Sequence, residues 1–180
     1  MIVTEEEKLI FYKEISADSP INNVVIPNID FEEDEAYKFE WALNIKPLSG
    51  EQCFVFLEVN GVRNAYAINE GGFWGTPNTL DVSQKAFPDA MALGTGYTTP
   101  YDQPTSGYVT FYKHPDRDHN GYGHSFVGEK MHDDGHHYIT HILGGTIDQA
   151  VGPITNIGFV GDGTGSGTVT WYGWIKASKV

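Results

Sequence analysis

The alternation of apolar and polar residues with a period of two is the feature of this sequence that most constrains its fold. In the range 37–45, every odd position is aromatic or aliphatic, whereas every even position is charged, polar or alanine. Successive side chains of a strand point to opposite faces of a sheet, so one face of this strand suits a core and the other suits water or a partner. No segment shows sustained helical periodicity, and the chain is therefore predicted to be all-β.

Two further strands are predicted in the range 154–175, where a glycine-rich connector joins two apolar runs. In the second run, Val169, Trp171 and Ile175 share one face. The glycines between positions 161 and 167 tolerate positive φ, as a tight turn requires. We therefore expect a C-terminal hairpin whose last strand is paired on both sides, with Trp171 buried or at a subunit contact.

Other apolar or alternating runs predict the remaining strands. These runs are 8–15, 24–27, 53–59, 62–68, 108–113, 125–130 and 136–143. The Asn60-Gly61 pair is a strong hairpin signal, so the run at 62–68 is expected to return beside 53–59. The pattern predicts a single domain over 1–180, a jelly-roll-like antiparallel β-sandwich of about nine to ten strands. Residues 1–35 are expected to hold the N-terminal strands and an acidic loop.

A long irregular central loop is predicted at 70–106, because glycines and prolines are frequent there and periodicity is weak. One short helix is expected within 81–93. The aromatic residues of the loop either pin it to the sandwich or contact a sugar or a neighbouring subunit. A polar tip follows at 114–124. The candidate contacts with a partner or a glycan in these two segments are Phe73, Trp74, Tyr97, Tyr101, His114, His119, Tyr122 and His124.

The charge balance argues against several partner classes. The chain has 24 acidic and 11 basic residues, a formal net charge of -13, so it should avoid nucleic acid and anionic membranes. Five acids fall within 30–35, which predicts a solvated loop, the alternative being a calcium- or partner-binding edge. No signal peptide and no membrane span are recognised. The single Cys53 excludes an internal disulfide and is expected in the core.

The histidines and acids are the only candidates for chemistry. All seven histidines lie between His114 and His141, together with four aspartates, but their spacing matches no metal motif. No G-x-S-x-G elbow is present, and no acid pair points to sugar hydrolysis. We therefore expect no metal, no cofactor and no enzymatic activity, with local hydrogen bonds as the role of the histidines.

Two segments carry a resemblance to a family of small virion proteins of tailed bacteriophages. The C-terminal run matches the family's last hairpin at Ile154, Ile157, Phe159, Gly167, Thr168, Val169, Trp171, Tyr172 and Gly173. The upstream run matches at Phe56, Leu57, Val59, Asn60, Gly61 and Tyr66. Together they cover about a quarter of the chain. Trp171 departs from the leucine that is usual there, and the segment 70–106 does not align.

The resemblance implies a role in the virion, after synthesis in the host cytoplasm. The first expectation is a structural accessory protein, a capsid decoration or cement protein on the particle surface. The second is a tail or fibre component with a carbohydrate-binding face, and the third is a glycan-degrading enzyme. Other virion proteins and further copies of the chain, with a trimer among the expected forms, are the implied partners, and a host glycan is a candidate ligand.

Overall fold

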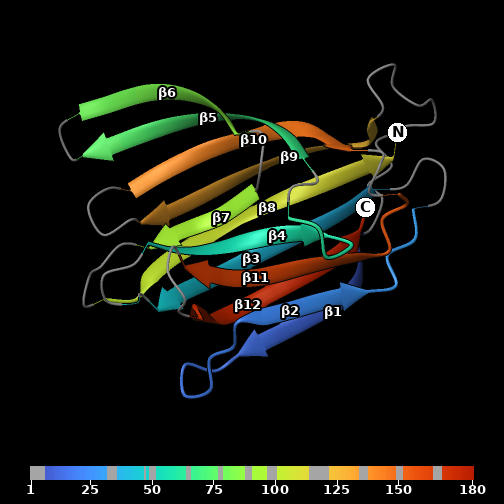
Figure 1. The fold of residues 1–180 in the computed structure, drawn as a ribbon, viewed down its shortest axis with the longest axis horizontal. Coiled ribbons are helices and arrows are strands. Elements are labelled where there is room, and N and C mark those ends of the chain that lie inside the picture. The colour runs from blue at the N-terminus through green and yellow to red at the C-terminus, as the bar shows by residue number, and fades with distance from the viewer. Residues whose placement is uncertain are drawn as a thin grey trace.

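The protein is an all-β sandwich of two antiparallel sheets, which confirms the predicted fold class (Figure 1). A computed structural model describes residues 7–31, 36–46, 48, 52–63, 66–76, 79–87, 91–96, 101–113, 122–133, 138–148, 152–163 and 168–180. These residues form twelve strands and no helix, so the expected nine or ten strands are too few. The jelly-roll connectivity stays a prediction.

The larger sheet has eight strands in the order β1-β12-β3-β8-β9-β10-β5-β6. Their bounds are β1 Lys8–Ile15, β3 Ala36–Lys46, β5 Tyr66–Thr76, β6 Thr79–Phe87, β8 Gln103–Lys113, β9 Tyr122–Asp133, β10 Tyr138–Asp148 and β12 Thr170–Lys179. The smaller sheet has the order β2-β11-β4-β7. Its strands are β2 Asn23–Pro27, β4 Cys53–Val59, β7 Met91–Gly96 and β11 Asn156–Gly163. In Figure 1 the smaller sheet lies over one part of the larger one, and β10, β5 and β6 extend beyond it.

The core lies between the sheets and follows the sequence alternation. In β3, Phe39, Trp41 and Leu43 are buried while the residues between them are half-buried. The strand β4 shows the same pattern, and its Cys53 is buried and free, as expected. The predicted face of the last strand is confirmed, because Trp171 and Ile175 in β12 and Val169 just before it are all fully buried. The pleat thus turns the local period of two directly into an inward and an outward face.

The predicted C-terminal hairpin is wrong, although its two strands are present. β11 pairs with β2 and β4 in the smaller sheet, whereas β12 pairs with β1 and β3 in the larger sheet. The connector therefore crosses from one sheet to the other. Two strands that face each other across a core cover each other's apolar side chains. Two neighbouring strands of one sheet pair through their edges and do not cover each other's faces. The expectation that β12 is paired on both sides is confirmed.

The Asn60-Gly61 turn forms, but it does not lead into a hairpin. Both residues have positive φ, 51° and 74°, and the Val59 and Val62 backbones exchange hydrogen bonds of 3.1 and 2.8 Å. Pairing ends after this bridge, and the chain continues into β5 of the larger sheet. The Asn60 amide instead donates to the Pro153 carbonyl oxygen at 2.8 Å. The turn is therefore held against the segment that precedes β11.

The interpretation of 70–106 as a long irregular loop is wrong. Most of β5, all of β6 and β7, and the start of β8 fall within this range, and the helix expected within 81–93 is replaced by strands. β5, β7 and β8 find hydrogen-bonding partners from distant parts of the chain, as β5 does with β10, whereas β6 pairs with its sequence neighbour β5. Long-range pairing of this kind overrides the weak local preference of a glycine-rich segment. Within the part of the chain that is described, no helix could span a membrane.

Candidate functional site

The open side of the sandwich, where β1 and β2 end their sheets, is the candidate site. Among the residues that the structure describes, each strand is paired along one edge only, β1 with β12 and β2 with β11. In Figure 1 the two strands lie one above the other at the same side of the molecule. An edge strand presents unpaired backbone N–H and C=O groups, which another chain can use. We call β1 and β2 together the open edge.

Large apolar side chains are exposed along the open edge. The exposed fraction is 56% for Leu9, 55% for Tyr12 and 49% for Val25. Single exposed apolar residues are ordinary on protein surfaces, but several on two adjoining edge strands mark a contact surface. The sequence predicted both strands, yet it did not distinguish an edge strand from a central one.

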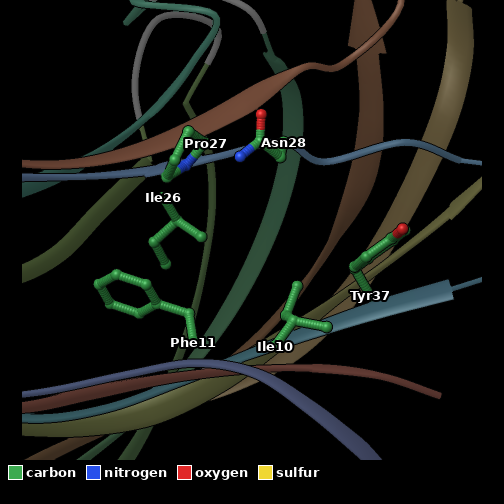
Figure 2. A pocket seen from close by; sticks show the side chains of 6 residues that line it. All are labelled: Ile10, Phe11, Ile26, Pro27, Asn28 and Tyr37. Atoms are coloured by element: carbon green, nitrogen blue, oxygen red, sulfur yellow. The ribbon is translucent and has the colours of Figure 1, made fainter.

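A pocket opens between the two strands, with a volume of about 290 Å³. Figure 2 shows Ile10 and Phe11 from β1 facing Ile26 from β2 across this opening. A β-bulge between Leu9 and Phe11 leaves Ile10 without a register partner, and a bulge re-aims side chains. Its volume is at the lower end of the range of about 300–1,000 Å³ that is usual for ligand pockets, and it has room for one or two apolar side chains of a partner.

The polar end of the pocket is formed by Asn28 and Tyr37 (Figure 2). The Tyr37 hydroxyl donates to the Asp30 carbonyl oxygen at 2.5 Å. Asn28 has a φ of 61°, in the left-handed region that asparagine tolerates better than most residues. Its side-chain amide finds no hydrogen-bond partner among the described residues. The pocket therefore has apolar walls and one amide ready to bind a backbone or side-chain group.

An ion-pair network fixes the start of β1 to the outer face of the larger sheet. Glu7 accepts from Lys38 and from Lys176, both at 3.2 Å, and Lys176 also donates to Glu40 at 2.8 Å. The hydrogen bond from Lys176, followed by the one from Lys38, lowers the pKa of Glu7 below its usual value. These side chains come from β3, β12 and the residue before β1, so they tie the edge strand to its neighbours.

The carboxylates of this network raise the pKa values of its two lysines. Hydrogen bonds to Glu40 and then to Glu7 raise the pKa of Lys176. Burial alone would lower the pKa of Lys38, but the hydrogen bonds to Glu40 and Glu7 outweigh it and the pKa is raised. Burial would likewise raise the pKa of Glu40, and the two lysines reverse this and lower it. All four groups are therefore charged at neutral pH.

Charge is distributed unevenly between this side of the molecule and the rest. Glu7 with β1, β3 and β12 carries six lysines and three glutamates, a formal charge of +3. Because the total is -13, the remaining residues carry -16. The strands β1, β3 and β12 are therefore a basic part of an acidic protein, which favours contact with an acidic surface.

The predicted contact residues do not gather at this site. Phe73 and Trp74 lie on β5, where they pair with residues at the start of β10, and Tyr101 is 76% exposed just before β8. Tyr122 begins β9 and pairs with Asp148 at the end of β10, so the tip assigned to 114–124 is shorter than expected. Tyr97, His114 and His119 lie outside the described residues.

The assignment of His124 as a surface contact is wrong. Its side chain is buried, with 9% exposed, and its ring meets the edge of Phe31 at a centroid distance of 5.0 Å. His124 occupies an inward position of β9, which the tip interpretation did not foresee because the strand was expected to start at 125. Phe31 is likewise buried, although it lies in the acidic segment 30–35 that was expected to be solvated, and Asp30 beside it is exposed.

The described residues contain no group of three or more histidine, cysteine or acidic side chains that could hold a metal ion. Comparisons of the chain with protein-family models, with curated proteins and with solved structures find no match.

Proposed function

We propose that the protein is a non-enzymatic structural subunit that associates with further copies of itself through the open edge. The exposed Leu9 and Tyr12 on β1, an edge strand with free backbone groups, are the observation on which this proposal rests. Covering these side chains removes apolar surface from water, which is the usual driving force of association. Backbone pairing along β1 adds hydrogen bonds that fix the direction of the partner.

The charge distribution selects another copy of the chain as the occupant. A formal charge of +3 on Glu7, β1, β3 and β12 contrasts with -16 on the rest of each molecule, so this basic part of one copy complements the acidic surface of another. Such a contact joins two different surfaces, and a contact of this kind closes into a ring when the rotation between copies permits. A trimer is one such closed form.

The resemblance to small virion proteins of tailed bacteriophages supports a second part of this proposal, that the protein is located on a phage particle. A structural protein present in many copies on a particle needs a self-complementary surface and no catalytic centre. Capsid decoration is the role that fits best, with the acidic side of the molecule directed away from the packaged nucleic acid. Tail or fibre location is the alternative, and the two differ in where the chain sits on the particle.

Sedimentation velocity of the full chain tests the association. The unmodified chain should form a defined oligomer that weakens as salt is raised from low to high concentration, because screening reduces the charge complementarity. Leu9→Asp should shift the chain to the monomer, whereas Val127→Asp, which alters an exposed apolar residue on β9, should not. A monomeric unmodified chain, or an unchanged oligomer with Leu9→Asp, would contradict the proposal.

The location is tested separately with purified particles. Immunogold labelling against the chain should place it on the capsid at many copies per particle. Labelling confined to the tail would support the alternative location, and absence from purified particles would reject a virion role.

A further inference from the structure

The outward face of the smaller sheet carries a stacked aromatic pair. Phe54 and Phe56 occupy outward positions of β4, between residues of the same strand that are fully buried. Their rings are stacked, with centroids 5.2 Å apart and an interplanar angle of 25°. Both side chains are half-buried, so part of this apolar platform stays accessible. The pair belongs to the opposite sheet from β1 and is independent of the exposed residues on that strand.

A guanidinium group is held beside this platform by the Asn60-Gly61 turn. Arg63 follows the turn and lies over the Phe56 ring, 4.5 Å from its centroid. It donates to the Glu58 carboxylate at 3.4 Å through Nε and at 3.3 Å through one terminal nitrogen, and its other terminal nitrogen donates to Asp162. A guanidinium has five N–H groups. Two of these groups on Arg63 are therefore left to donate to a ligand.

The acidic partners leave acceptor capacity at the same place. Both hydrogen bonds from Arg63 to Glu58 reach Oε1, so the other carboxylate oxygen, Oε2, has no partner among the described residues. Gly158 on β11 borders this oxygen, and a methyl group built there would lie 3.9 Å from it. The absence of a side chain at this position leaves room beside Oε2. Asp162 accepts from the Gly163 amide at 2.9 Å, which orients its carboxylate.

We propose that this face, defined by Phe54, Phe56, Glu58, Arg63 and Asp162, is a binding site for a neutral glycan. The C–H face of a pyranose ring stacks on an aromatic ring, and its adjacent hydroxyls both donate and accept hydrogen bonds. Free N–H groups on Arg63 supply the matching donors, and a free oxygen on Glu58 supplies the matching acceptor. Hydrogen bonds to charged groups are stronger than those between neutral groups, so they compensate for the exposure of the site to water.

The charges of the site select a neutral ligand over an ionic one. Arg63 and its two carboxylates together carry a formal charge of -1, which disfavours phosphate, sulfate and acidic sugars. A cationic peptide would be attracted by the carboxylates and by the aromatic rings. However, an ammonium group cannot accept hydrogen bonds from the free N–H groups of Arg63. Sugar hydroxyls satisfy both kinds of free group. None of these residues is among the contacts expected from the sequence.

A glycan microarray probed with the full labelled chain tests this site. The array should include neutral hexose and N-acetylhexosamine oligosaccharides, sialylated and sulfated glycans, and a lysine-rich peptide as a cationic probe. We expect binding to neutral glycans, and a loss of at least tenfold in signal for Phe54→Ala and for Glu58→Gln. Tyr112→Ala changes an exposed aromatic residue on β8, in the opposite sheet, and should leave the signal unchanged.

Arg63→Lys keeps the charge but removes the fork of donors, so it should weaken binding while the chain remains folded, as checked by its melting temperature. Binding of the lysine-rich peptide alone, no binding to any glycan, or equal glycan signals for the unmodified chain and Phe54→Ala would overturn the proposal. The result is separable from that of the proposed function, because the Phe54→Ala chain should sediment as the same oligomer as the unmodified chain.

Discussion

The neighbouring strands β1 and β12 have similar shares of apolar residues but opposite fates in the fold. β12 is hydrogen-bonded along both edges, and its Trp171, Ile175 and Ala177 are fully buried beneath the smaller sheet. β1 is hydrogen-bonded along one edge, and its Leu9 and Tyr12 are more than half exposed. Position in the sheet therefore decides which apolar residues stabilise the fold and which are left for a partner. Four measurements of stability test this difference between the two strands.

The largest effect is expected at the centre of β12. Trp171→Ala should lower the free energy of unfolding by about 3–5 kcal/mol, because a large buried side chain is replaced by a cavity. Trp171→Phe is the matched control. The indole nitrogen has no hydrogen-bond partner among the described residues, so Trp171→Phe loses no hydrogen bond and should cost less. Urea unfolding of the three chains measures both differences, and an equal loss for the two variants would contradict this account.

The crossing from β11 to β12 should be the next most sensitive place. A methyl group at Gly161 would overlap the Val169 carbonyl oxygen, so the two sheets could not approach as closely there. Gly161→Ala should therefore cost about 1–3 kcal/mol, as overpacking does. Gly158→Ala on the same strand is the control, since its nearest neighbour would be 3.6 Å away. Thermal unfolding of both variants compares them, and a similar loss at the two positions would show that the crossing is not close-packed.

A smaller effect is expected from the ion pairs that tie β1 to the sheet. The pKa values of Glu7 and Glu40 are lowered in the folded state, so their contribution is present above the ordinary value of 4.5 and is lost as pH falls through the folded values. Pairs of this exposure contribute about 0–1 kcal/mol each because water screens them. Glu40→Gln should flatten the acid side of a melting-temperature profile measured from neutral pH downward. A profile with an unchanged slope would mean that other carboxylates dominate.

On the alkaline side of the same profile, the stabilisation by this network is lost as pH rises instead of as pH falls. The pKa values of Lys38 and Lys176 are raised, so their contribution is complete below the ordinary value of 10.5 and is lost as pH rises through the folded values. Neutral pH therefore lies within the range in which the whole network is charged.

The smallest effect on folding is expected at the open edge. Leu9→Ala should change the free energy of unfolding of the monomer by no more than about 0.5 kcal/mol, since the side chain is already exposed. Leu43→Ala on β3 is the buried counterpart and should cost about 2–5 kcal/mol. Chemical denaturation at concentrations below association measures both. A loss for Leu9→Ala comparable with that for Leu43→Ala would show that β1 belongs to the core.

The sequence alone did not predict the open edge or the outward aromatic face. The run KLIFYKEI predicts a strand, but a strand bonded on one edge and a strand bonded on two edges share the same composition. The apolar run 53–59 predicts a strand, but not that Phe54 and Phe56 stack on its outward face. Only the register of β4 with β11 places Asp162 beside Phe54, from more than a hundred positions away in the chain. The turn at Asn60 could be predicted, but not that it would bring Arg63 over Phe56.

The positions of most strands, and the side of each strand that faces the core, follow from the local pattern of the sequence. A period of two is a local property of an extended backbone, so the buried positions of β3, β4 and β12 follow from neighbouring residues alone. Tertiary contacts fix which strands pair, place β11 and β12 in different sheets, and make strands of the described residues within 70–106. These choices depend on hydrogen bonds and packing between residues far apart in the chain, and a local pattern holds no information about its distant partner.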